Sequence, residues 1–222
     1  MVNVLGICGS PIKGGNTEVF LNQALLAASE SGAQTELISL AGKKINECLH
    51  CNFCLRKQSE GIFCAQKDEM NALYPKVLNA DALMVASPAY FGRLSGLTAI
   101  FLDRLRVFAF GNYYVGKMKN KVAGALTVAW GRFAGAETTL LSIDYAFLGL
   151  EMVIASVHHQ AVLFGAGGFS SIGGTGEFDP ADKKLVLRDE KALKSARSLG
   201  KRVVELAQVI KIGQEELSRR SL

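Results

Sequence analysis

The sequence lacks the features that would place it in a membrane, in the secretory route or on nucleic acid. No uninterrupted apolar run approaches the roughly eighteen residues that a membrane span needs. The first residues, MVNVLG, carry no charged region ahead of a signal-like stretch. In the basic C-terminal stretch 183–222, the basic residues are not interleaved with aromatics, as a nucleic-acid-binding surface would require. We therefore expect a cytoplasmic protein that binds neither a membrane nor nucleic acid.

Basic residues outnumber acidic ones at the C-terminal end. Residues 183–222 hold 11 Lys/Arg against 5 Asp/Glu, whereas the rest of the chain holds 14 against 15. Most of these basic residues fall on a helical repeat at about 189–212, away from its apolar face. The pattern predicts a basic C-terminal helix with a solvated face. With 222 residues, 49% of them hydrophobic, the chain is predicted to be a single domain, 1–222, with an insertion.

Strand and helix patterns alternate along the chain. Apolar runs predict strands at 2–8, 35–40, 82–87, 121–129 and 151–157, and helical repeats predict helices at 17–31, 68–78, 96–108 and 136–148. This alternation indicates an α/β fold, a doubly wound five-stranded parallel sheet in the order 2-1-3-4-5. Pro75 should kink its helix or begin a second one. Residues 165–176 contain six glycines and predict a mobile loop.

Four of the five cysteines lie in an insertion at about 43–66, after the second strand. Cys48, Cys51 and Cys54 form a C-x2-C-x2-C run, which suits three corners of a cubane iron-sulfur cluster, and Cys64 can return as the fourth ligand. Zinc also accepts four thiolates, but structural zinc usually takes two separated C-x2-C pairs. The run therefore favours iron-sulfur over zinc. Cys8, at the end of the first strand, is predicted to be a small buried hydrophobe.

Three loops should meet where the strand order reverses, which is where doubly wound sheets bind ligands. Loop 10–17 leads into a helix whose free N–H groups and dipole favour a phosphate, unless Asn16 or Thr17 caps that helix. It lacks the Lys-Ser/Thr of a nucleoside triphosphate loop. Loop 87–92 brings Tyr90 and Phe91, which suit a flat ligand or ordinary packing. Loop 128–135 adds backbone donors and Arg132.

These loops and the cysteine insertion together resemble the iron-sulfur flavoproteins, a branch of the NAD(P)H-dependent FMN reductase family with a flavodoxin-like fold. The resemblance rests on the stretches GSPIKGGNT (9–17), SPAYFGRLSGLTAIFLDR (87–104) and the cysteine run. It implies FMN, with its phosphate in loop 10–17 and its ring against 88–92 and 128–135. It also implies a [4Fe-4S] cluster, which the family arranges across subunits, and a homodimer or homotetramer. The gap between Cys54 and Cys64 is longer here than is usual in the family.

The candidate site residues follow from the loops and the resemblance together. We predict metal ligation by Cys48, Cys51, Cys54 and Cys64. The predicted cofactor-binding residues are Ser10, Ile12, Lys13, Gly15, Asn16, Thr17, Pro88, Ala89, Tyr90, Phe91, Gly92, Trp130, Gly131, Arg132 and Gly135. No catalytic acid or base is predicted, because the redox chemistry belongs to the cofactors.

The expected function is that of an electron-transfer flavoprotein. It requires no acid–base residue, because two cofactors exchange electrons with each other and with a redox partner such as ferredoxin or NAD(P)H. One alternative is an NAD(P)H-dependent FMN or quinone reductase in which the cysteines are structural or bind zinc. A binding or regulatory protein on the same scaffold is a third hypothesis, since a fold alone does not fix a function.

Overall fold

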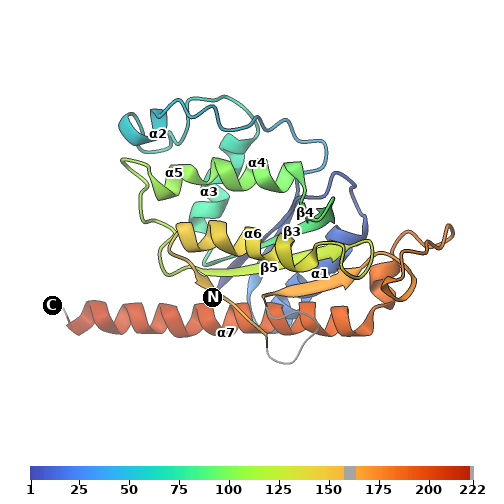
Figure 1. Cartoon of the computed structure of the whole chain (residues 1–222). Coiled ribbons are helices and arrows are strands. Elements are labelled where there is room, and N and C mark those ends of the chain that lie inside the picture. Colours follow the sequence, from blue (N-terminus) through green and yellow to red (C-terminus); the bar gives the residue numbers. More distant parts are fainter. Residues whose placement is uncertain (158–163, 221–222) are drawn as a thin grey trace.

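A twisted parallel sheet lies at the centre of the computed structural model, which describes residues 1–157 and 164–220 (Figure 1). Its strand order is β2-β1-β3-β5-β6. The strands are β1 (Asn3–Cys8), β2 (Gln34–Ser39), β3 (Ala82–Tyr90), β5 (Val122–Ala129) and β6 (Val153–Ile154). The predicted order is confirmed, because the fourth and fifth strands expected from the sequence are β5 and β6. The labels differ only because the short β4 (Arg93–Leu94) pairs antiparallel with the end of β3.

Helices cover both faces of the sheet (Figure 1). One apolar cluster packs α1 and α7 against it, and a second packs the opposite helices and part of the cysteine insertion. The first layer consists of α1 (Asn16–Glu30) and α7 (Glu190–Arg220); the second consists of α3 (Met70–Asn79), α4 (Gly96–Arg104), α5 (Arg106–Ala109) and α6 (Ala136–Gly149). The doubly wound arrangement is therefore confirmed.

The glycine-rich stretch 165–176 is not the mobile loop that its composition predicts. It contains the strand β7 (Ala166–Phe169), which pairs parallel with β5, and the 3-10 turn η1 (Ile172–Gly174). A Cβ at Gly168 would come within 2.9 Å of the side chains of Ala192 and Val186. Glycine is needed here because the strand packs closely against α7. A strand of glycines lacks the run of apolar side chains by which strands are predicted from sequence.

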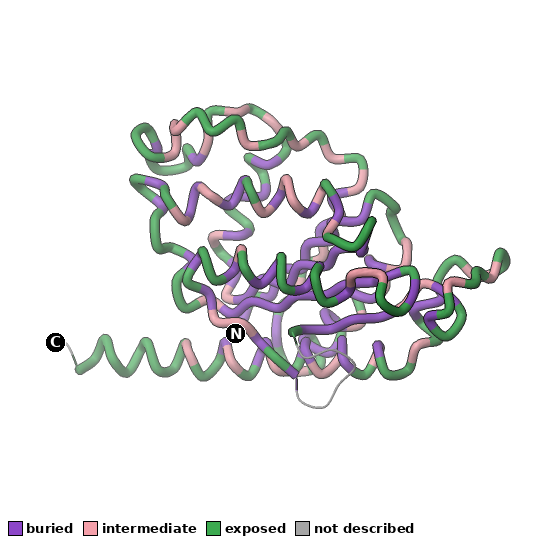
Figure 2. Tube along the Cα trace, in the orientation of Figure 1, coloured by how far each residue is buried: buried purple, intermediate pink, exposed green. Residues whose placement is uncertain are grey.

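Several helix boundaries also differ from prediction. The helix α3 runs through Pro75 as one element, so no second helix begins there. The helix expected at 96–108 is divided at Leu105 into α4 and α5. The C-terminal helix continues past residue 212 to Arg220, and its last turns project beyond the body and are exposed (Figure 2). None of the helices within the described ranges is both long and apolar enough to cross a membrane.

The cysteine insertion forms a layer of its own outside α4 and α5, on the side away from the sheet (Figure 1). It is mostly irregular and contains the single-turn helix α2 (Phe53–Arg56). A second irregular segment follows β7 and includes the 3-10 turn η2 (Leu185–Arg188) before α7 begins. These two segments, on opposite sides of the molecule, build the two candidate sites.

Helices α1 and α7 approach each other closely at one glycine. A Cβ added at Gly200 would lie 2.0 Å from the carbonyl oxygen of Ala24. Because that obstacle is backbone, a side chain here can be accommodated only if the two helices separate. Gly213, on the same helix, has open space around the position of its Cβ.

We expect Gly200→Ala to lower the free energy of unfolding by about 1–3 kcal/mol, the usual cost of overpacking. Gly213→Ala should leave it unchanged or raise it by up to about 1 kcal/mol, since alanine is the better helix former. Urea denaturation followed by circular dichroism measures both. An equal effect of the two substitutions would contradict the close helix approach.

Candidate functional site

A cavity of about 710 Å³ opens at the carboxyl ends of β1, β3 and β5. This is the reversal point of the strand order, where doubly wound sheets bind their ligands, and the volume lies in the range of small-molecule and cofactor sites. The lining residues are Ser10, Ile12, Lys13, Gly14, Gly15, Asn16, Thr17, Pro88, Ala89, Tyr90, Val128, Trp130, Ser170, Phe178, Asp179, Pro180, Asp182, Lys183, Lys184 and Leu185.

The first wall is the loop between β1 and α1. The backbone N–H of Ile12 donates to the buried Ser10 hydroxyl at 3.1 Å, and Gly14 takes a left-handed conformation with φ +67°. Gly15 occupies the N-cap position, so no side chain caps α1 in the described structure. The Asn16 side chain points elsewhere: it donates to the carbonyl of Lys183 and accepts from the N–H of Val186. The first N–H groups of α1 are thus left to an anion.

The second wall is a hairpin, whereas the sequence indicated a flexible loop. β3 continues through Pro88 and Ala89 to Tyr90 and turns back into β4 at Phe91-Gly92, both with positive φ (53° and 79°). Ser95, which follows, donates to the carbonyl of Gly9 at 2.6 Å. The hairpin is thereby tied to the first loop.

The third wall combines the loop after β5 with the segment after β7. The Trp130 indole N–H donates to the carbonyl of Gly176 at 2.8 Å, and its ring stacks on Phe178 with 5.7 Å between centroids. The Ser171 hydroxyl donates to the carbonyl of Trp130 and accepts from the N–H of Gly176. These contacts hold a half-exposed aromatic wall at the end of β5, the strand that pairs with β3 of the hairpin.

Ten of the predicted cofactor-binding residues line this cavity, and five do not. Those lining it are Ser10, Ile12, Lys13, Gly15, Asn16, Thr17, Pro88, Ala89, Tyr90 and Trp130. Phe91 is fully exposed at the tip of the hairpin. Gly92 and Gly135 pack together, since a Cβ on Gly135 would lie 2.4 Å from Gly92 backbone. Gly131 bridges to Thr175, and Arg132 lines a different cavity of about 510 Å³ beside the start of α7.

The sequence interpretation missed the segment 178–185, which supplies Phe178, Asp179 and Lys183 to the cavity. This segment has no hydrophobic periodicity. It is held at the site by the side chain of Asn16, which is far away in the sequence and hydrogen-bonds to its backbone. Asp182 and Asp179 also pair with Arg188. The only sequence signal was the local mixture of charges and proline, which is typical of any surface loop.

The second candidate site is a small hollow in the cysteine insertion. Cys48, Cys51, Cys54 and Cys64 all line it, together with Arg104 and Arg106. All five cysteines of the chain are free thiols. No three His, Cys, Asp or Glu side chains in the described residues are arranged around one point as ligands of a single metal ion. The four predicted ligands thus face one hollow without forming a mononuclear site.

Cys64 reaches this hollow because the long segment before it is firmly anchored. The buried Gln58 amide donates to the carbonyls of Phe63 and Val107, and its oxygen accepts from the N–H groups of Tyr113 and Tyr114. Phe63 lies stacked between Tyr114, at 4.1 Å between centroids, and Tyr74. A packed loop therefore spans the nine residues between Cys54 and Cys64.

The aromatic residues of α5 and of the segment that follows it divide between core and surface. Phe108 and Tyr114 are buried around Phe63, whereas Phe110 and Tyr113 are exposed at 63% and 48%. Only the latter two are available to another molecule.

The buried side chain of Arg104 also contacts Cys64. Arg104, 1% exposed, donates to both carboxylate oxygens of Asp68 (2.6 and 3.3 Å), to the hydroxyl of Tyr74 and to the carbonyl of Asn46. Its Nη2 also lies 3.6 Å from Cys64 Sγ. Burial acts to raise the pKa of Asp68, but the bonds from Arg104 and the Asn46 N–H hold it below its usual value.

The remaining cysteines lie on a loop with unusual backbone geometry. His50 and Asn52, each between two cysteines, have φ of 51° and 58°, a conformation that non-glycine residues rarely adopt. Arg106 donates from Nη2 to the Asn52 side chain at 2.8 Å. Burial raises the pKa of Cys54, and Arg106 acts to lower it. Cys8, by contrast, is fully buried in β1, as predicted of a small buried hydrophobe, and burial raises its pKa to about 11.

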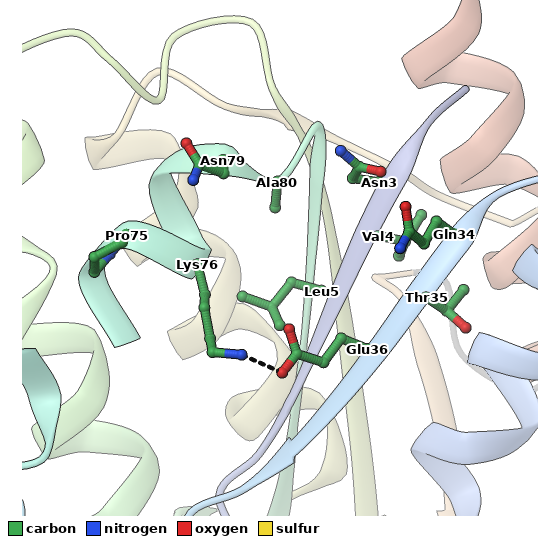
Figure 3. A pocket seen from close by; sticks show the side chains of 10 residues that line it. All are labelled: Asn3, Val4, Leu5, Gln34, Thr35, Glu36, Pro75, Lys76, Asn79 and Ala80. Atoms are coloured by element: carbon green, nitrogen blue, oxygen red, sulfur yellow. Dashed lines mark hydrogen bonds and ion pairs between the residues drawn. The ribbon is translucent and has the colours of Figure 1, made fainter. Parts of the chain in front are cut away.

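A further cavity, of about 280 Å³, opens at the amino ends of β1 and β2 (Figure 3). The Lys76–Glu36 ion pair crosses it, next to Pro75 and Asn79 (Figure 3). It lies at the amino ends of the strands, whereas a switch-point ligand binds at their carboxyl ends.

The chain is similar to known flavoproteins over most of its length. The family described as NADPH-dependent FMN reductase matches residues 2–165. An iron-sulfur flavoprotein of Methanocaldococcus jannaschii is 35% identical over 95% of this chain and 100% of its own length. Another, from Archaeoglobus fulgidus, is 31% identical over 95% of this chain and 98% of its own.

Solved structures agree with the fold. A flavodoxin, WrbA-like protein from Agrobacterium tumefaciens superimposes with a TM-score of 0.58 at 17% identity, covering 94% of this chain and 98% of that protein. The fold is therefore flavodoxin-like. The chain belongs to the NADPH-dependent FMN reductase family, in its iron-sulfur flavoprotein branch, and is a flavin-dependent oxidoreductase.

Proposed function

We propose that the chain binds FMN in the switch-point cavity and a [4Fe-4S] cluster on Cys48, Cys51, Cys54 and Cys64, and passes electrons between them and a redox partner such as ferredoxin or NAD(P)H. The observation that carries the proposal is the gathering of all four cysteines at one hollow with two arginines. The relatives named iron-sulfur flavoproteins support the same cofactor pair.

The FMN assignment rests on the family and on the complementary walls of the cavity. The uncapped start of α1 offers N–H groups to the phosphate. Tyr90, Trp130 and Phe178 offer apolar surface to a planar ring. Ser170 and the backbone near it supply polar contacts. When bound, FMN supplies the one- and two-electron chemistry, and these residues bind and orient it.

The cysteine hollow fits an anionic, thiolate-bound group. Arg106 has a buried Nε that lacks a hydrogen-bond partner within the described chain, and Arg104 already points Nη2 at Cys64. Structural zinc usually takes two separated C-x2-C pairs. The contiguous C-x2-C-x2-C run of this chain therefore favours the cluster over zinc.

Within one chain the two sites are separated by the length of α4. The helix follows Ser95, which contacts the FMN-side loop, and ends at Arg104, which contacts Cys64. Its nine residues rise about 13 Å at 1.5 Å per residue. We propose a homodimer or homotetramer in which a second chain brings its FMN to the cysteine layer, and exposed Phe110 and Tyr113 on that layer suit such a contact.

Replacing Asn16 should test the phosphate position. Asn16→Asp keeps the acceptor for Val186 N–H but adds a carboxylate at the start of α1. We expect the Kd for FMN to rise at least tenfold, about 1.4 kcal/mol, and that for riboflavin, which lacks the phosphate, to change much less. Asn16→Ala is the uncharged control and should affect both ligands alike. Titration of the apoprotein by flavin fluorescence gives these values; equal losses in Asn16→Asp would place the phosphate elsewhere.

Replacing one predicted ligand should separate the two cofactors. Anaerobically purified wild-type protein should contain about four iron and four sulfide per chain, as a cubane cluster requires. Cys51→Ala should lose the cluster and keep FMN, because Cys51 lies in the cysteine layer. Cys8→Ala, which removes a buried thiol in β1, should retain both. Stoichiometric zinc without iron in the wild type, or undiminished iron in Cys51→Ala, would contradict the proposal.

The family supports a second candidate, an NAD(P)H-dependent FMN or quinone reductase that works without a cluster. Stopped-flow spectroscopy of Cys51→Ala distinguishes the two. Under the proposal, the variant reduces its FMN with NADPH at the wild-type rate within about twofold, since hydride transfer involves the flavin alone. Electron delivery to a one-electron acceptor such as ferredoxin should fall at least tenfold. If the variant also serves one-electron acceptors normally, the second candidate is correct.

A further inference from the structure

Arg106 presents an unused hydrogen-bond donor and an unpaired charge at the cysteine hollow. Its Nε is buried and has no acceptor among the residues that the structure describes. Nη2 donates to the neutral Asn52 side chain, and the guanidinium lies 5.6 Å from the centre of the Phe110 ring. None of the ion pairs found in the described chain involves Arg106. A buried N–H of a cation without an acceptor is unfavourable, so this group calls for an anionic acceptor.

Arg104, the other arginine of the hollow, differs in this respect. Asp68 accepts two hydrogen bonds from it, and both side chains are almost completely buried. Its charge is therefore balanced within the protein. Arg106 is the cation whose charge remains available to whatever the four cysteines bind.

The nature of the acceptor follows from the walls of the hollow. Apart from the two arginines and Asp103, the ionisable side chains that line it are His50 and the four cysteines. Thiolate and sulfide sulfur carry negative charge and accept N–H hydrogen bonds. Asn52, which Arg106 holds, lies between Cys51 and Cys54 in a left-handed conformation. Arg106 thus holds the cysteine loop through Asn52 and lines the same hollow as the four cysteine side chains.

We propose that Arg106 is a positioning residue that donates a hydrogen bond from Nε to a sulfur atom of the cysteine-bound cluster and raises the reduction potential of that cluster. This inference rests on the proposed function. Reduction adds one electron, delivered by the redox partner, and makes the cluster more negative by one charge. A nearby cation and N–H donor stabilise the reduced form more than the oxidised form.

The test is a redox titration of the purified holoprotein, followed by electron paramagnetic resonance of the reduced cluster. At the wild-type midpoint, Arg106→Gln should show a ratio of reduced to oxidised cluster at least tenfold lower, which corresponds to 59 mV for one electron. Arg106→Lys keeps the charge but lacks Nε, so it should fall between the two. Arg56→Gln removes an equal charge from the exposed surface of α2 and should change the ratio less than twofold, because solvent screens it.

A second readout detects the hydrogen bond itself. The Fe–S stretching bands in the resonance Raman spectrum of wild type and Arg56→Gln should shift on transfer to D2O, and the shift should diminish in both Arg106 variants. If both Arg106 variants lose the cluster while keeping FMN and Arg56→Gln keeps both, contact between Arg106 and the cluster is supported. If only Arg106→Gln loses the cluster, the midpoint potential of Arg106→Lys is the test: a midpoint below that of the wild type supports the inference, and the wild-type midpoint contradicts it.

Two results would overturn the inference while leaving the proposed function intact: a cluster-containing Arg106→Gln or Arg106→Lys with the wild-type midpoint and D2O shift, or an equal change in Arg56→Gln. A wild-type protein without iron would instead refute the proposed function, so the two failures are distinguishable.

Discussion

The buried guanidinium of Arg104 is the interaction on which the cysteine layer depends. It joins the end of α4 to Asp68 just before α3, to the Asn46 carbonyl at the start of the cysteine segment and to Cys64 at its end. Taking such a pair out of water costs several kcal/mol per ion unless the remaining donors are satisfied. Here the Tyr74 hydroxyl, the Asn46 carbonyl and Cys64 satisfy them. The Arg104–Asp68 pair therefore fixes the position of the irregular cysteine insertion. Apolar packing is less directional and would fix that position less precisely.

Helix α4 transmits this arrangement to the other site. At its start, Ser95 accepts from Thr98 N–H as the N-cap and donates to the Gly9 carbonyl. Gly9 has room for no side chain, since a Cβ would lie 1.8 Å from Thr98 Oγ1. One rigid helix thus has the loop before α1 at one end and the cysteine hollow at the other. A change in the position of α4 would move both candidate sites together.

The sequence predicted the parts of this molecule that depend on local pattern. Continuous apolar runs predicted the central strands, and the reversal of strand order predicted where Ser10 and Tyr90 would meet. Three cysteines at fixed spacing predicted their common hollow. The wall at 178–185 was missed because a single distant side chain, Asn16, holds it.

Packing also explains the errors. Glycines usually weaken strands, so the stretch that contains β7 looked like a loop, although Gly168 is required by its approach to α7. Spacing alone left Cys64 uncertain, because the residues that anchor the preceding segment, Gln58 and Phe63, make contacts with Val107 and Tyr114 that no local pattern contains.

Strained backbone conformations are concentrated at the two candidate sites. Six non-glycine residues in the described ranges have positive φ, and four of them belong to the candidate sites or their rims: His50 and Asn52 between the cysteines, and Phe91 and Phe133 in the loops beside the switch-point cavity. Each such residue costs about 1 kcal/mol or more. Packing of Gly92 on Gly135 and the hydrogen bond from Thr138 to the Gly92 carbonyl hold the two loops, as Arg106 holds Asn52. Both loops are therefore shaped by contacts between protein groups.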